Sequence, residues 1–179
     1  MKLTWFGGTT IRVHIGGQIF VTDPDGAPVG IDRAELVSGA DRVLRLAGAD
    51  EALATIDPAG WRRRPPPRAI DEDDGPAPVH AFRIGSGAML VEAVSEPPLV
   101  LVAGAAPPFG RWADDSVVVL LGDGEAMAAL AEGLLDAARP RLLALASTEA
   151  AVDFVIAALR ERLGGAGLVA MEPGLALEV

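Results

Sequence analysis

Apolar and polar residues alternate along the first part of the chain at the period of a half-buried β-strand. Residues 3–6, 11–15 and 18–22 alternate or run apolar at strand length, and Gly16-Gly17 connects the last two of these segments. A two-glycine connection suits a primed hairpin turn, because both central residues of such a turn need a positive φ. We therefore predict that the chain opens with antiparallel strands.

Two helices are predicted in the last third of the chain. The first has apolar residues at helical spacing, namely Met127, Leu130, Leu134 and Ala138. Asp123 is its candidate N-cap and Pro140 ends it. The second has an apolar stripe of period 3.6, namely Val152, Val155, Ile156, Leu159 and Leu163. Ser147 or Thr148 opens this helix, and Gly164-Gly165 closes it.

Other apolar runs predict further strands. These runs are residues 43–46, 79–84, 88–94, 98–103, 117–121, 142–145, 167–171 and 175–179. A short helix or turn is expected at 31–38, and one or two helical turns at 50–56. Clusters of strands with helices late in each half indicate a layered α/β sandwich.

Residues 58–78 differ sharply in composition from the rest of the chain. Three arginines, three prolines and a fourth arginine occupy 62–68, and an acidic run follows at 71–74. Proline removes backbone donors and like charges repel, so we expect no packed element there. The chain is interpreted as one domain over 1–179, with 58–78 as an irregular insertion within it.

Composition excludes several classes of function. The net charge of −10 argues against a nucleic-acid surface, which needs concentrated Lys and Arg. The absence of cysteine excludes thiolate ligands, and two histidines are too few for a His-rich zinc site. His14 is expected to be an exposed strand residue next to Arg12. No apolar run is long enough to cross a membrane and no signal peptide is evident, so we expect a cytoplasmic protein.

Several short segments carry a resemblance to one family of enzymes. Residues 5–10 read Trp-Phe-Gly-Gly-Thr-Thr, residues 20–24 read Phe-Val-Thr-Asp-Pro, and residues 171–179 contain a Pro-Gly pair. These segments resemble the opening, the second strand and the terminal hairpin of metallo-β-lactamase-fold hydrolases, in particular the branch of the L-ascorbate 6-phosphate lactonases. Residues 43–53 line up without a gap with the Val-Leu-x-Thr-His-x-His-x-Asp-His-Leu of that branch. The resemblance implies a four-layer αββα sandwich, trimmed in the middle.

The resemblance also implies where metal ligands would stand. In this fold histidines, including one near the end of a late strand, and a bridging aspartate hold the metals, and a metal-bound water is the nucleophile. The corresponding positions here are Ala47, Ala49, Glu51, Ala52, Ala105 and Ser147. Alanine offers no lone pair, so we expect these positions to be vacated and no metal or other cofactor to be bound.

Asp23 is a retained residue of the family's site. A buried carboxylate without the charge of a metal is costly and needs a compensating partner. Arg45 stands where the family's strand has an apolar residue, just before the vacated loop, so its guanidinium is a candidate partner for Asp23. The alternation of strand side chains could equally direct Arg45 to solvent.

An enzyme fold without its ligands is best interpreted as a pseudoenzyme that acts through its surface. The leading hypothesis is a structural or accessory subunit that binds a protein partner in a larger assembly. Its candidate contact residues combine tryptophan, phenylalanine and arginine, which favour interfaces, and they are Trp61, Arg62, Arg63, Arg64, Arg68, Phe109, Arg111 and Trp112. Residues 58–78 are either a docking segment or a solvated linker.

Two other hypotheses remain open. One is a metal-dependent hydrolase with an atypical carboxylate site built from Asp23, Asp50 and Glu51. The other is a small-ligand binding module that uses the vacated pocket, with a small, uncharged lining of Gly8, Ala47, Ala49, Ala52 and Ala105. Metal analysis and ligand-induced changes in melting temperature would separate these hypotheses from the leading one.

Overall fold

A first β-sheet is built from the N-terminal strands and the last strand of the chain. The structure, a computed structural model, describes residues 1–48, 50, 52–64 and 78–179. The sheet contains β1 (Lys2–Gly7), β2 (Thr10–Ile15), β3 (Gln18–Thr22), β4 (Arg42–Leu44) and β12 (Ala176–Glu178), in the order β12-β1-β2-β3-β4. Gly16 and Gly17 have φ of 57° and 76°, which confirms the predicted glycine turn between β2 and β3.

The second sheet is larger and mixes parallel and antiparallel pairs. It contains β5 (Ala54–Thr55), β6 (His80–Gly85), β7 (Ala88–Glu92), β8 (Leu99–Val102), β9 (Val117–Leu121), β10 (Leu142–Ala146) and β11 (Gly167–Ala170), in the order β11-β10-β9-β8-β7-β6-β5. Strands β8 to β11 run parallel, whereas β7 is antiparallel to both β6 and β8.

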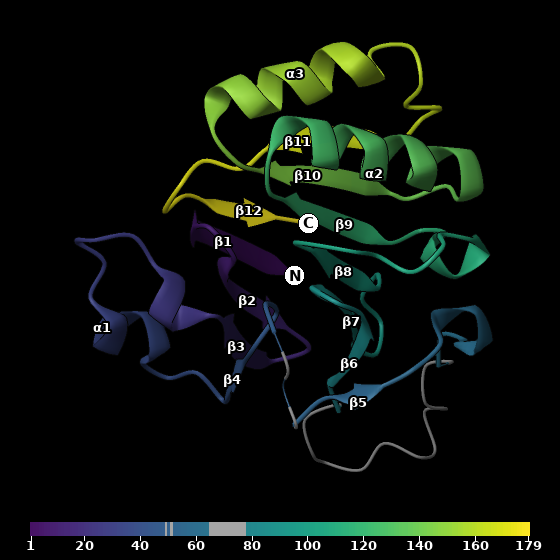
Figure 1. Cartoon of the computed structure of the whole chain (residues 1–179). Helices are drawn as coiled ribbons and strands as arrows, with labels where there is room; N and C mark the ends of the chain where they lie inside the picture. Colours follow the sequence, from purple (N-terminus) through teal and green to yellow (C-terminus); the bar gives the residue numbers. More distant parts are fainter. Residues whose placement is uncertain (49, 51, 65–77) are drawn as a thin grey trace.

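The two sheets pack face to face, and the second sheet is buried on both faces (Figure 1). Strand β9 shows this clearly, because all five of its residues are buried. Its alternate residues Val117, Val119 and Leu121 belong to the core between the sheets. Val118 and Leu120 belong to a second core under the helices. A continuous apolar run is what a strand buried on both faces requires.

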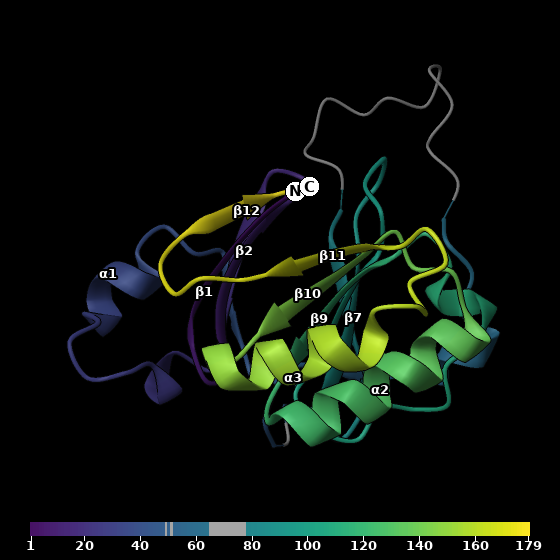
Figure 2. The same ribbon diagram turned by 90° about the horizontal axis from the view of Figure 1, so that it is seen from above.

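Helices cover the outer faces of the sandwich. α2 (Gly124–Ala137) and α3 (Glu149–Leu159) lie side by side on the second sheet (Figure 2). Asp123 caps α2 and Thr148 caps α3 by accepting backbone N–H groups. The short α1 (Arg33–Val37) lies on the outer face of the first sheet, where Arg12 of β2 donates to the Leu36 carbonyl at 2.6 Å. The predicted layered α/β sandwich is confirmed.

The prediction of one or two helical turns at 50–56 is wrong for the residues after Leu53. Leu53 donates to the Asp50 carbonyl in a single turn, and the chain then forms β5, which pairs in parallel with β6. Sheet pairing therefore overrides a weak helical pattern. The described part of 58–78 also contains a packed element, a 3-10 helix at Pro58–Gly60 that Asp57 caps and that buries Pro58. Residues 65–77 lie outside the described residues.

Candidate functional site

The parallel strands give the second sheet two distinct edges. Because β8, β9 and β10 run in the same direction, the residues that follow them share one edge and those that precede them share the other. We call these the carboxyl edge and the amino edge. Ala105 and Ser147 follow β8 and β10 and therefore lie at the carboxyl edge. This is also the edge at which open α/β sheets usually bind ligands.

The predicted metal loop, residues 45–53, meets the carboxyl edge at a shallow cavity of about 670 Å³. The cavity is lined by Gly48, Asp50, Thr55, Arg83, Ile84, Gly85 and Ser86. Gly85 also lies against the segment that follows β8, since a Cβ built there would be 2.5 Å from the Ala105 carbonyl oxygen. The loop, the turn between β6 and β7, and the Ala105 segment are therefore neighbours.

Asp23 holds the start of this loop. Its Oδ2 accepts the Ala47 backbone N–H at 3.0 Å, and its own N–H donates to the Leu44 carbonyl at 3.0 Å. Asp23 has a left-handed backbone, with φ of 41° and ψ of 54°, which is uncommon outside glycine. Its half-buried carboxylate thus has a backbone partner in place of a cation.

Asp50 closes the loop from the other side. Its Oδ2 accepts the Arg45 N–H at 2.7 Å and its Oδ1 accepts the Ala52 N–H at 2.9 Å. A carboxylate that accepts two amide hydrogen bonds in this way organises the loop around itself. The Asp50 carboxylate therefore ties together the residues on each side of the bend.

Arg45 does not reach Asp23. Its side chain is exposed, and no described carboxylate lies within 4.0 Å of its guanidinium. The expected pairing is replaced by the Ala47 amide, because the short side chain of Asp23 can reach the loop backbone directly. The backbone of Arg45 is used instead, since its carbonyl accepts Arg83 Nη2 at 3.0 Å. Arg83, in the middle of β6, is a site residue that the sequence pattern did not indicate.

The other positions that the resemblance predicts to be vacated have structural roles or face solvent where the structure describes them. Ala47, Ala52 and Ala105 are exposed, and the Ser147 hydroxyl donates to the Gly122 carbonyl. Ala49 and Glu51 lie outside the described residues. The predicted lining of small, uncharged residues is incorrect for the described part of the cavity, because Arg83 and Asp50 contribute to it.

The described side chains do not fit a metal centre. No group of three or more His, Cys, Asp or Glu side chains comes together in residues 1–48, 50, 52–64 and 78–179. Asp23 and Asp50 direct carboxylate oxygens at backbone N–H groups. A catalytic zinc needs about three protein ligands and an open position. The described part of the carboxyl edge supplies no such set.

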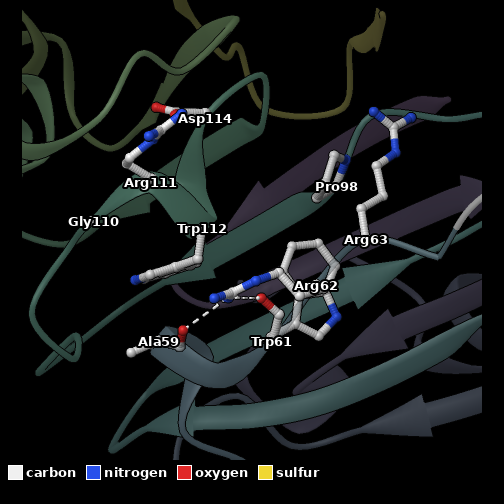
Figure 3. Close-up of a pocket in the computed structure, with 9 residues that line it drawn as sticks. All are labelled: Ala59, Trp61, Arg62, Arg63, Pro98, Gly110, Arg111, Trp112 and Asp114. Atoms are coloured by element: carbon white, nitrogen blue, oxygen red, sulfur yellow. Dashed lines mark hydrogen bonds and ion pairs between the residues drawn. The ribbon is translucent and has the colours of Figure 1, made fainter.

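At the amino edge the structure unites two segments that the sequence indicated separately. Trp61 and Arg62 meet Arg111 and Trp112 across a pocket of about 520 Å³ (Figure 3). The other lining residues are Ala59, Arg63, Pro98, Gly110 and Asp114. Pro98 precedes β8 and the 3-10 helix Arg111–Ala113 precedes β9, which places the pocket opposite the vacated ligand positions.

The tryptophan side of this pocket is well packed. Trp112 is buried, its Nε1 donates to the Pro108 carbonyl at 3.3 Å, and its ring stacks on Phe109 with centroids 5.9 Å apart. Trp61 is half-buried and packs against the core under the helices. The aromatic rings are therefore pre-ordered.

Two of the predicted contact arginines form hydrogen bonds and ion pairs with other residues of the chain. Arg63 donates to the Glu96 carbonyl at 2.7 Å and pairs with Asp115 at 3.4 Å. The Arg64 N–H donates to Glu92 Oε1 at 2.6 Å, and its guanidinium lies 3.6 Å from Glu92 Oε2. These contacts dock residues 61–64 onto the second sheet. Arg68 lies outside the described residues.

Glu92 is a second site residue that the sequence did not reveal. It is 4% exposed at the end of the apolar strand β7, where a carboxylate needs a partner. Arg64 supplies that partner, and its Nη1 also lies 2.6 Å from His80 Nε2. Because arginine is always a donor, this His80 nitrogen is the acceptor.

His14 lies on β2, next to Arg12 as expected, and is half-buried rather than exposed. Arg12 Nε donates to His14 Nε2 at 3.4 Å. Burial lowers the pKa of His14 below its ordinary value of 6.5, and the positive charges of Arg12 and Lys2 lower it further. This histidine has no carboxylate ligand set around it in the described residues.

Comparison with known proteins identifies the fold. Igni18, a metallo hydrolase from the archaeon Ignicoccus hospitalis, superposes with a TM-score of 0.55 at 15% identity, over 99% of this chain and 98% of its own. The chain has a metallo-β-lactamase fold. A candidate Zn-dependent hydrolase of the metallo-β-lactamase superfamily from Thermotoga maritima gives a TM-score of 0.49 at 15% identity, over 96% of this chain and 99% of its own. No family model and no curated protein matches the sequence.

Among the helices that the structure describes, none is both long and apolar enough to span a bilayer.

Proposed function

We propose that this metallo-β-lactamase-fold protein is a pseudoenzyme that acts as a structural or accessory subunit and binds a protein partner. The observation that carries the proposal is the hydrogen bonding of Asp23 and Asp50, the two described carboxylates that contact the backbone of the predicted metal loop. Asp23 and Asp50 accept backbone N–H groups and fold the loop upon itself. Carboxylates engaged in this way replace the structural role that a metal would have.

A second observation favours binding over catalysis. Exposed arginines and the partly covered rings of Trp61 and Trp112, residue types that suit an interface, converge on one pocket at the opposite edge of the sheet. Surfaces with such residues supply most of the binding energy in protein complexes. Function would then lie away from the carboxyl edge, where enzymes of this architecture hold their metals.

The test is complex formation by the full chain. Tagged protein captured from its host, under conditions that keep complexes intact, is expected to retain one partner in stoichiometric amount. The pair is then reconstituted from purified components and sized by light scattering. A chain that runs alone and monomeric, or that hydrolyses a substrate in a metal-dependent way abolished by Asp23→Ala, would contradict the proposal.

The atypical hydrolase is less well supported, because Asp50 uses both carboxylate oxygens on loop amides. The small-ligand module retains one favourable observation, which is the cavity of about 670 Å³ with Arg83 in its wall. A melting-temperature increase with sugar phosphates that disappears in Arg83→Ala would favour that module.

A further inference from the structure

The pocket at the amino edge combines exposed positive charge with aromatic surface. From this geometry we propose that it binds a short acidic peptide segment of the protein partner, with carboxylates on Arg62 and Arg111 and an apolar side chain against Trp61 and Trp112. The volume of about 520 Å³ lies within the range of about 300–1,000 Å³ that ligand sites occupy. The inference rests on the proposed function in one respect, that the partner is a protein.

Arg62 presents its charge inside the pocket. Its Nη1 donates to the backbone carbonyls of Ala59 at 2.9 Å and of Trp61 at 2.7 Å, as the dashed lines in Figure 3 show. These acceptors orient the guanidinium and carry no negative charge. No described carboxylate lies within 4.0 Å of Arg62, so its charge is available to an anionic group.

Arg111 supplies a second charge at the rim. Its side chain is 96% exposed, and its only ion pair with a described residue joins Nε to Asp114 Oδ2 at 3.7 Å. That pair is weak because it is long and solvated. Asp114 also has another hydrogen-bond partner, since its Oδ1 accepts the Arg139 N–H at 2.8 Å. The terminal nitrogens of Arg111 can therefore bind a carboxylate.

Arg63 lines the same pocket but has a different role. Asp115 pairs with it at 3.4 Å and the Glu96 carbonyl accepts its Nη2. Its charge is largely offset within the chain. The binding cations are therefore Arg62, which follows the 3-10 helix Pro58–Gly60, and Arg111, which opens the 3-10 helix Arg111–Ala113.

The charge of the rest of the chain makes this site selective. With a net charge of −10, most of the surface repels an acidic segment, whereas this pocket attracts it. The same net charge disfavours nucleic acid, whose binding needs a long basic surface. A small inorganic anion would use the arginines and leave the tryptophan surface uncovered. A peptide can supply a carboxylate and an apolar side chain together.

The experiment measures binding of a defined acidic peptide to the full chain. The probe is a fluorescein-labelled peptide in which Glu alternates with Phe and Pro, and binding is followed by anisotropy and by tryptophan fluorescence. The expected result is saturable binding that weakens about tenfold or more in the double variant Arg62→Ala with Arg111→Ala. Binding is also expected to weaken as salt rises.

The matched control is the double variant Arg33→Ala with Arg45→Ala. It removes the same charge from exposed sites on α1 and on the loop after β4, so the peptide should bind it as it binds the wild type. Trp61→Phe is expected to reduce the fluorescence change while the fold is kept. A peptide with Gln in place of Glu should bind at least about tenfold more weakly.

Several results would overturn the inference. These are no binding, equal binding of the Gln peptide, equal loss in both double variants, or tighter binding of an oligothymidylate through the same arginines. Self-association abolished by Arg62→Ala with Arg111→Ala would assign the pocket to a second copy of the chain instead. If a partner is still captured when the peptide does not bind, this inference fails and the proposed function stands. If the peptide binds but the chain captures no partner, the proposed function fails alone.

Discussion

The two edges of the second sheet differ in how they use charged residues. At the carboxyl edge Asp23 and Asp50 direct their carboxylates at the backbone of their own loop. At the amino edge Arg62 and Arg111 leave their charges available beside tryptophan rings. The first arrangement holds the loop together, and we propose that the second binds a partner. This contrast shows that carboxylates engaged with their own backbone and arginines that face solvent can occupy opposite edges of one sheet.

The largest effect is expected from Gly85→Ala at the carboxyl edge. A Cβ there would lie 2.5 Å from the Ala105 carbonyl oxygen, so the backbone must shift and the free energy of unfolding should fall by about 1–3 kcal/mol. Urea denaturation measures this change. The control is Gly133→Ala in α2, where a Cβ meets nothing within 4 Å and the helix should gain up to about 1 kcal/mol. Equal stability of the two variants would show that the vacated edge is not tightly packed.

Arg64→Ala tests whether the amino edge contains structural as well as available arginines. The buried Glu92 would lose its charged partner, and because Arg64 is half exposed we expect a loss of about 2 kcal/mol rather than the larger value of a fully buried pair. Residues 61–64 should also become more sensitive to limited proteolysis. Arg62→Ala should change stability by less than about 0.5 kcal/mol. If the two variants lose the same free energy of unfolding, then the assignment of Arg64 to the fold and of Arg62 to binding is incorrect.

Asp50→Ala should cost about 1 kcal/mol, because two amide hydrogen bonds of a half-exposed carboxylate are lost. The comparison variant is Asp25→Ala, whose carboxylate makes a single ion pair within the described residues, an exposed one with Arg33, so its loss should be close to neutral. Thermal unfolding with and without a chelator measures both variants. A loss for Asp50→Ala that appears only when metal is present would contradict the structural role of Asp50.

The smallest expected effect is a pH dependence of folding stability. It comes from His14 on β2, which lies at neither edge of the second sheet. The pKa of His14 is lowered in the folded state, chiefly by burial and then by Arg12 and Lys2, so the unfolded chain binds a proton more readily. The contribution of neutral His14 to the free energy of unfolding is fully present above the ordinary pKa of 6.5. It is lost as the pH falls through 6.5 toward the lowered pKa of the folded state. His14→Gln should flatten the stability profile in that window. An unchanged profile would show that another group causes the dependence.

The sequence predicted most of the fold because periodicity reports burial directly. The run 117–121 matches β9, and the Asp123 cap of α2 is present. The predicted stripe is buried in α3 at Val152, Val155 and Leu159, whereas Ile156 is exposed and Leu163 lies beyond the end of the helix. The strand at Ala54–Thr55 was missed because its existence depends on pairing with β6, a long-range contact that no local pattern contains.

The candidate site was predictable in its residues but not in its geometry. The sequence indicated Trp61 and Trp112 in separate segments, and the topology joins them in one pocket. The Arg64–Glu92 pair was hidden because Glu92 ends an otherwise apolar strand and its partner is distant in sequence. Of the two orientations predicted for Arg45, the structure has the one toward solvent, and the Ala47 amide is the partner of Asp23 because its N–H lies within reach of the short side chain.

The most direct test of the account is the metal content of the purified full chain. The protein is incubated with zinc, manganese or ferrous iron, dialysed, and analysed by mass spectrometry, alongside Asp23→Ala with Asp50→Ala. The account predicts no stoichiometric metal in either protein and no metal-dependent rise in melting temperature of the wild type. One or two equivalents of metal held by the wild type and lost in the double variant would contradict it.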